Sequence, residues 1–233
     1  MPALMHLAWP KLSRRLLVTG GVFLLAFLVV TVLVQTGSFA KLNLRTTHYL
    51  QARGSDGQNL ALGLFAYLGS IEATLVIAIL IGVALFRGLR LLAVLPAAVI
   101  LFASGLEYVG KRLVVSHGPG AALDRFPSFL PTLSHKLAAY SYPSGHVLRA
   151  TVTYGLVLYL AERWELFGRD SSRLSPVLAL LIFLMGYAVI YLGWHWLADA
   201  IGGLLLGLTL LFGLIAYLER KRTVNPGHAH TDD

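Results

Sequence analysis

The sequence of 233 residues contains no cysteine, and only 13% of its residues are charged. The absence of cysteine excludes disulfide bonds, a thiolate nucleophile and a cysteine-based zinc site. A soluble domain contains about 25% charged residues, whereas this chain is 57% hydrophobic. The net charge of +8 is compatible with nucleic-acid binding, but basic residues in so apolar a chain more often flank membrane spans. The composition therefore predicts a polytopic membrane protein without a nucleic-acid partner.

Apolar segments long enough to cross a bilayer as helices recur along the chain. We expect an all-α bundle of six transmembrane helices in a single domain, with spans at about 16–35, 71–86, 91–110, 144–160, 174–193 and 198–218. The first apolar stretch is longer than a signal-peptide core of about 7–15 residues, so we expect it to be retained as a span. Residues 36–60 are polar, and residues 223–233 are predicted to be a disordered tail.

The basic residues predict the orientation of these spans. If the amino terminus is cytoplasmic, the short inside segments hold eleven of the 19 basic residues and the long outside connections hold seven. The inside set is Lys11, Arg14, Arg15, Arg87, Arg90, Arg163, Arg169, Arg173, Arg220, Lys221 and Arg222. By the positive-inside rule, both termini are predicted to be cytoplasmic and the loop from Lys111 to Tyr142 to be outside.

The junction of the last two spans contains His195 and Asp199. Residues four apart share a face of a helix, so Asp199 is expected to accept a hydrogen bond from one nitrogen of His195. The other nitrogen would then be available for nucleophilic attack. The alternative is a His–Asp pair that only holds two helices together, as buried charges in membranes commonly do.

The fourth span begins with Pro143-Ser144-Gly145-His146. Proline and serine are typical of a helix start, where backbone N–H groups favour an anion, and Gly145 permits a ligand to approach the backbone. His146 would lie beside that anion as a proton donor, or it is simply an interfacial histidine. Arg149 lies three residues later, inside an apolar span, and is expected to face a polar cavity.

Two further cations, Lys111 and Arg112, end the third span. Lysine commonly binds phosphate as a point charge. The alternative for Lys111 is a salt bridge with Glu107, one helical turn earlier. Arg112 is either a second phosphate ligand or an interfacial anchor. For Arg149, the alternative to a place in the polar cavity is a structural salt bridge with Glu72 or Glu107.

Together, these motifs resemble the type-2 phosphatidic acid phosphatase family of integral membrane lipid phosphatases. The family signature reads K-x6-R-P, P-S-G-H and S-R-x5-H-x3-D. Residues 143–146 match the second motif, His195 and Asp199 match the third, and Lys111 and Pro119 match the first. Motif order and spacing agree from about residue 60 to 218.

The chain departs from the signature at both of its arginines. The first-motif arginine falls on Gly118, and the serine and arginine of the third motif fall on Ala188 and Val189. In the family these arginines hold the phosphate, and glycine and valine supply no charge. Arg149, Arg112 and Arg125 are the candidates to replace them.

The resemblance implies an integral membrane phosphatase that acts on a lipid phosphate or polyprenyl diphosphate. It implies that His195 attacks phosphorus, Asp199 orients His195, and His146 protonates the leaving group. Lys111, Ser144 and the Gly145 N–H would hold the phosphoryl oxygens, without metal or other cofactor. The plasma (bacterial inner) membrane is the expected location, with the site on the extracytoplasmic side. The alternatives are a weak or inactive relative that binds or transports a lipid headgroup, and a structural membrane partner.

Overall fold

The computed structural model describes residues 5–86, 93–127, 140–163 and 174–224. Within these ranges the chain forms α-helices and two short 3-10 helices, η1 (Tyr67–Gly69) and η3 (Ala121–Leu123), without β-strands. The α-helices are α1 (Met5–Gln35), α2 (Ala40–Gln51), α3 (Asp56–Ala66), α4 (Ile71–Phe86), α5 (Leu95–Leu113), α6 (Gly145–Arg163), α7 (Leu174–Tyr191) and α8 (Leu197–Val224). The predicted all-α fold is confirmed.

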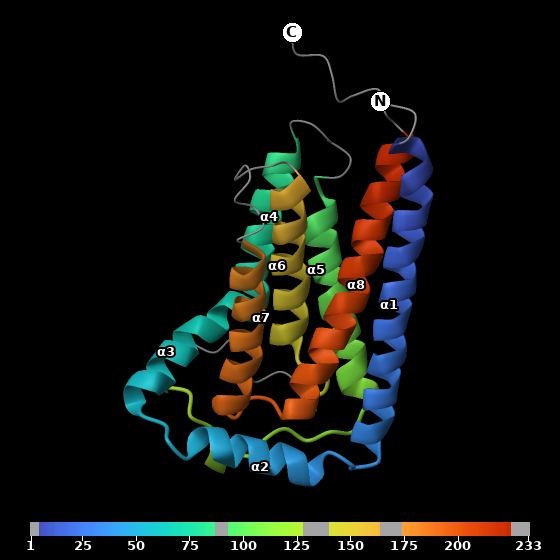
Figure 1. Cartoon of the computed structure of the whole chain (residues 1–233). Helices are drawn as coiled ribbons and strands as arrows, with labels where there is room; N and C mark the ends of the chain where they lie inside the picture. Colours follow the sequence, from blue (N-terminus) through green and yellow to red (C-terminus); the bar gives the residue numbers. More distant parts are fainter. Residues whose placement is uncertain (1–4, 87–92, 128–139, 164–173, 225–233) are drawn as a thin grey trace.

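The long helices α1, α4, α5, α6, α7 and α8 run lengthwise through the bundle (Figure 1). Each corresponds to one predicted span. The start of α1 and the end of α8 lie at the same end of the bundle (Figure 1). The end of α5, the start of α6 and the junction of α7 with α8 all lie at the opposite end. The three motifs are therefore brought to one end of the bundle, as expected from the sequence.

Helix boundaries agree with the predicted spans to within four residues, except that α1 begins at Met5, eleven residues before the predicted start, and α8 ends six residues beyond its predicted end. Residues 71–86 form α4 as predicted, whereas α5 begins at Leu95, with Pro96 in its first turn. The last helix is longer than predicted: Thr223 and Val224, assigned above to the tail, still belong to α8. The remainder of the predicted tail, 225–233, lies outside the described residues.

Three of the described helices contain segments that are long and apolar enough to cross a membrane: Leu12–Gln35, Leu174–Tyr191 and Leu197–Arg220. Residues 56–69 and 71–83 pass the same test together as a pair bent by 48°. Hydropathy does not select α5 and α6, because these helices carry charged and polar side chains of the motifs, among them Lys111 and Arg149.

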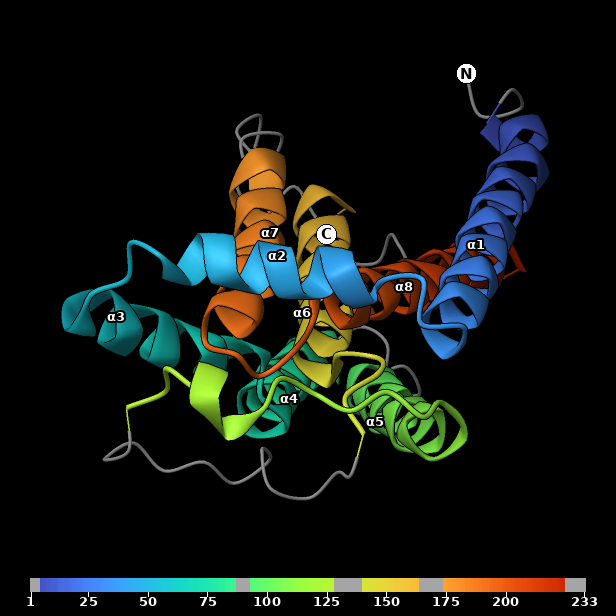
Figure 2. The same cartoon turned by 90° about the horizontal axis from the view of Figure 1, so that it is seen from below.

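The polar segment at 36–60, for which no helix was predicted, folds into α2 and the first turn of α3. Helix α2 lies across the end of the bundle that holds the motifs (Figure 2). Its polar side chains Asn43, Thr47 and Gln51 face inward and are buried. Asn43 accepts a hydrogen bond from Ala198 N at 3.1 Å, and Gln51 donates to Tyr191 O at 2.7 Å. They thus satisfy backbone groups that the ends of α7 and α8 leave unpaired.

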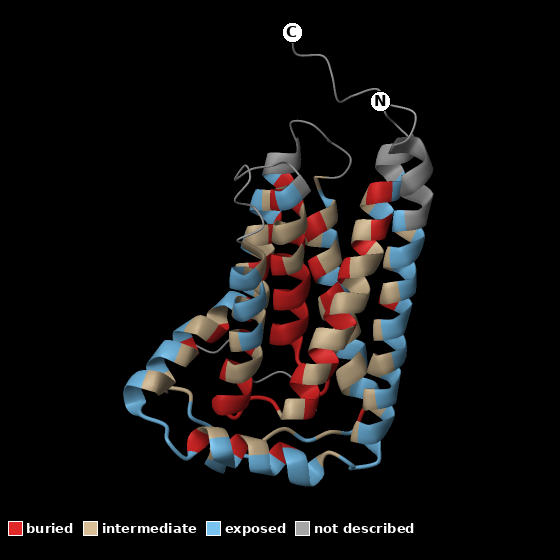
Figure 3. Cartoon of the chain, in the orientation of Figure 1, coloured by how far each residue is buried: buried red, intermediate tan, exposed pale blue. Residues whose placement is uncertain are grey.

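The core is centred on α6, whose residues 145–154 are all buried, whereas α1 presents most of its surface outward (Figure 3). Small residues let α8 approach α6. A Cβ atom at Gly203 would lie 2.4 Å from Ser144 O, so only glycine permits this contact. The close approach fixes the start of α6 against the first turns of α8.

Candidate active site

The start of α6 is anchored to α8 through backbone hydrogen bonds. Ser144 N donates to Asp199 O at 2.9 Å, and Leu148 N donates to Ser144 O at 3.1 Å. The helix start predicted for residues 143 and 144 is therefore confirmed. The Ser144 hydroxyl is fully buried and has no hydrogen-bond partner among the described residues. A buried hydroxyl without a partner is uncommon in a folded protein and suggests a place for a ligand.

His195 lies in the tight turn between α7 and α8. Gly193 has φ +72°, a conformation that favours glycine. Trp194 N and His195 N both donate to Val189 O, at 3.0 and 3.1 Å. Because α8 begins at Leu197, His195 precedes the helix. The expectation that His195 and Asp199 occupy successive turns of one helix is wrong.

Asp199 belongs to the first turn of α8 and caps it, since its Oδ2 accepts a hydrogen bond from Trp196 N at 2.9 Å. The same oxygen lies 3.6 Å from His195 Nδ1. This is an ion-pair distance and too long for the predicted hydrogen bond. The turn before α8 brings the two side chains together but leaves His195 Nδ1 and Asp199 Oδ1 without hydrogen-bond partners among the described residues.

His146 lies in the first turn of α6, close to His195. The ring centroids of the two histidines are 6.3 Å apart, and the His146 ring lies 5.2 Å from that of Trp194. Both histidines are buried. Two imidazoles from separate elements thus meet in one buried place, with the Asp199 carboxylate behind one of them. Among the described residues, no three His, Asp or Glu side chains are grouped so that they could hold a metal ion.

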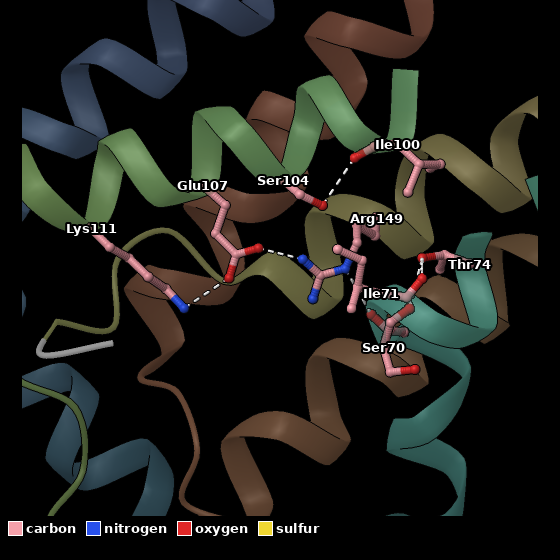
Figure 4. Close-up of polar contacts among 9 residues, drawn as sticks. Ser70, Ile71, Thr74, Ile100, Ser104, Glu107, Lys111 and Arg149 are labelled. Atoms are coloured by element: carbon pink, nitrogen blue, oxygen red, sulfur yellow. Dashed lines mark hydrogen bonds and ion pairs between the residues drawn. The ribbon is translucent and has the colours of Figure 1, made fainter. Parts of the chain in front are cut away.

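The buried Arg149 and the half-buried Lys111 converge on one carboxylate (Figure 4). Lys111 Nζ lies 2.8 Å from Glu107 Oε1, and the Arg149 guanidinium pairs with Glu107 Oε2. Arg149 also donates from Nε to Gly69 O at 3.3 Å. The salt bridges with Glu107 that were weighed as alternatives for Lys111 and Arg149 are thus present. Glu107 was considered in the sequence only as a partner for these cations.

Gly145, the first residue of α6, faces the same carboxylate. A Cβ atom at this position would lie 2.0–2.1 Å from the carboxylate atoms of Glu107. Glycine is required here because the Glu107 carboxylate lies against the backbone. The close approach expected of a ligand at Gly145 is made in this structure by a side chain of the protein itself.

Arg112 is not brought to the other predicted site residues. It is exposed, donates to the Tyr108 hydroxyl at 2.6 Å and stacks over that ring, with Cζ 4.8 Å from the centroid. This arrangement resembles the interfacial anchor weighed above. The positions of the missing family arginines are tightly packed. Val189 is fully buried, and a Cβ atom at Gly118 would lie 3.3 Å from Ser141 Cβ.

Comparison with known proteins connects this site to a family. Residues 92–223 match the PAP2 superfamily. A relative, phosphatidylglycerophosphatase B of Bacillus subtilis (strain 168), is 32% identical over 96 residues, which cover 41% of this chain and 46% of the relative. The alignment thus spans less than half of that protein.

The fold is similar to a solved structure described as the first transmembrane PAP2 type phosphatidylglycerolphosphate phosphatase from Bacillus subtilis. The TM-score is 0.74 at 21% identity, and the match covers 87% of this chain and 96% of the other. The family match covers more than half of the chain and includes all three motifs. The chain therefore belongs to the PAP2 superfamily, the family that its motifs resemble.

Proposed function

We propose that this protein is an integral membrane phosphatase that hydrolyses a lipid phosphate or polyprenyl diphosphate through a phosphohistidine. The observation that carries the proposal is the pair of buried imidazoles, His146 and His195, with ring centroids 6.3 Å apart. Asp199 stands 3.6 Å from His195 Nδ1. A nucleophile, a group that orients it and a proton donor are the parts that this chemistry requires.

In the proposed reaction, His195 Nε2 attacks phosphorus, and the P–O bond to the lipid breaks as the P–N bond forms. His146 gives its proton to the leaving oxygen. Water then attacks the phosphohistidine while His146 takes up a proton, and inorganic phosphate is released. Asp199 stabilises the positive charge that develops on His195, because its carboxylate faces Nδ1.

Binding of the phosphoryl oxygens is assigned to Lys111, the Ser144 hydroxyl and the Gly145 N–H. Phosphoryl transfer depends mostly on positioning and on stabilisation of charge. Arg149 is the better candidate to replace a missing arginine, because it is buried and near the start of α6. Arg112 is the weaker one, because its guanidinium is engaged with Tyr108.

Both Bacillus subtilis proteins are named as phosphatases of phosphatidylglycerophosphate. We propose this lipid as the first substrate to test. We place the protein in the bacterial inner membrane with the site facing outward, because the motifs lie at the end of the bundle opposite the start of α1. The basic residues predict that α1 starts on the cytoplasmic side.

The test is phosphate release by the purified protein in detergent from a panel of substrates. The panel contains phosphatidylglycerophosphate, phosphatidic acid, a polyprenyl diphosphate and a water-soluble phosphate monoester. Release from at least one lipid substrate, lost in His195→Ala, supports the proposal. A wild-type protein that is folded but releases phosphate from none of them contradicts it.

A second function is a weak or inactive relative that binds or helps to move a lipid headgroup. It is favoured by the salt bridges that occupy Lys111 and Arg149 in a chain that already lacks both family arginines. Such a protein would bind lipid phosphates without turnover. Binding of a labelled lipid phosphate that is unaffected by His195→Ala, together with no release of phosphate, would favour this function.

A further inference from the structure

Glu107 places a negative charge where the buried positive groups converge. Its carboxylate bridges Lys111 and Arg149, and the exposed fractions of the three side chains are 14%, 16% and 4% in that order. Figure 4 shows the carboxylate between the two cations, on the side of α5 that faces α6. One carboxylate therefore pairs with both cations in this structure and offsets one of their two positive charges.

The same carboxylate lies at the start of α6. Its atoms come within 2.0–2.1 Å of the position that a Cβ atom would take at Gly145. Unpaired N–H groups and the helix dipole attract anions at such a place. The neighbouring Ser144 hydroxyl is buried and lacks a hydrogen-bond partner among the described residues. Glu107 thus lies where the proposed function requires the phosphoryl group.

Lys111 and Arg149 do not carry enough positive charge to balance the Glu107 carboxylate and a phosphate group at the same time. A phosphate monoester carries nearly two negative charges at neutral pH, since its second pKa is about 6. Lys111 and Arg149 balance those two charges only if Glu107 is elsewhere. Two like charges held together in a site shielded from water repel each other strongly.

We propose that Glu107 is an internal competitor of the substrate. Its carboxylate occupies the proposed phosphate-binding place in this structure, and an incoming phosphoryl group displaces it and pairs with Lys111 and Arg149 instead. This inference rests on the proposed function for the location of the phosphate. Glu107 is then a positioning residue, which keeps the buried Arg149 and the half-buried Lys111 paired until substrate arrives.

The test measures binding of inorganic phosphate to the detergent-solubilised full chain, read from the rise in melting temperature with phosphate concentration. Glu107→Gln keeps the size of the side chain and removes its charge. We expect phosphate to bind this variant about tenfold more tightly than the wild type, because a like charge is removed. Arg149→Leu in the Glu107→Gln background should abolish most of that gain.

Two carboxylates serve as matched controls. Glu219 is buried near the end of α8, far from the site, and accepts a hydrogen bond from the Tyr159 hydroxyl at 2.7 Å. Glu72 is exposed in the first turn of α4. Neither Glu219→Gln nor Glu72→Gln should change the affinity for phosphate. An equal gain in either variant would show a general charge effect and overturn the inference.

Equal or weaker phosphate binding by folded Glu107→Gln would also overturn it. If that variant does not fold, Glu107→Asp keeps the charge but withdraws it from Gly145 by one methylene. This variant should bind phosphate more tightly than the wild type, and unchanged affinity would reject displacement. The assay needs no turnover, so tighter binding by a protein that never releases phosphate from lipids supports the inference while refuting the proposed hydrolysis.

Discussion

In a soluble protein apolar helix faces are buried and polar faces are exposed, whereas α1 and α6 of this protein show the opposite arrangement. Helix α1 is almost entirely apolar between residues 16 and 34, yet Val18, Leu25 and Val32 are exposed by 60%, 64% and 61%. Helix α6 carries His146 and Arg149, yet it is buried along residues 145–154. The apolar helix faces outward and the polar helix faces inward.

The difference follows from the solvent. Lipid tails are as apolar as leucine, so burial of an apolar face of α1 gains little. A charged or hydrogen-bonding side chain, in contrast, must find a partner inside the bundle. The helix with the lower hydropathy is therefore the one that carries the site, and a search by hydropathy passes over it.

The largest expected effect comes from the imidazoles of the polar interior. His195→Ala should lower lipid phosphate hydrolysis by at least about 10³-fold, because the proposed nucleophile is removed. His146→Ala should have an effect of similar size. Phosphate release is measured on protein whose melting temperature stays near that of the wild type.

A matched change on the lipid-facing helix is the control for this experiment. Thr19→Ala in α1 removes a polar group outside the site and should leave turnover intact. If folded His195→Ala hydrolyses the substrate at the wild-type rate, the nucleophile assignment is wrong and the polar interior of the bundle needs another explanation.

Asp199→Asn is expected to have the next largest effect. The variant keeps the shape of the side chain, and its amide oxygen can still cap α8 through Trp196 N. It removes the negative charge that faces His195 Nδ1 at 3.6 Å. Loss of an orienting carboxylate costs about 10⁴-fold in a well-studied catalytic triad, so we expect only trace activity. The measurement is phosphate release. Turnover close to the wild-type value would mean that Asp199 only caps α8 and does not assist His195.

The sequence predicts the helical bundle and its motifs well because both depend on local patterns. Long apolar stretches identify α1, α7 and α8, and the residues around Ser144 indicate the start of α6. The sequence places His195 between the last two spans, but it does not predict the shape of the turn there, since a separation of four residues suggested helical geometry for His195 and Asp199. The sequence also hides the inward polar face of α2. Asn43 and Gln51 bind backbone groups of distant helix ends, so only the assembled bundle reveals their role.

The place of Glu107 could be anticipated only in part. Its spacing from Lys111 predicts the salt bridge on α5. Its contact with Gly145 joins residues from different helices, and no local pattern records such a contact. The packing of α5 against α6 decides it.

A smaller effect is expected on stability. Leucine-to-alanine substitutions in α6 and in α1 compare the two helices directly. Leu148 on α6 is fully buried, whereas Leu25 on α1 is 64% exposed. Leu148→Ala should lower the free energy of unfolding by about 2–5 kcal/mol, because a cavity forms in the core. Leu25→Ala removes the same atoms from a lipid-facing position and should change it by less than about 0.5 kcal/mol. Unfolding in mixed micelles measures both, and equal losses would mean that α1 is covered by protein.

The smallest effect on activity is expected from single cysteines that report the orientation of the protein in the membrane, because they replace exposed side chains away from the site. The chain contains no cysteine, so each introduced thiol is the only reactive one. Tyr49 on α2 is 75% exposed at the end of the bundle that holds the histidines, and Glu162 is exposed near the other end, on the last turn of α6. If the site faces outward, Tyr49→Cys reacts with a membrane-impermeant maleimide in intact cells. Glu162→Cys then reacts only after the membrane is opened. The reverse pattern would show that the site faces the cytoplasm, where it would meet cytoplasmic phosphates. In detergent, both variants should keep their activity.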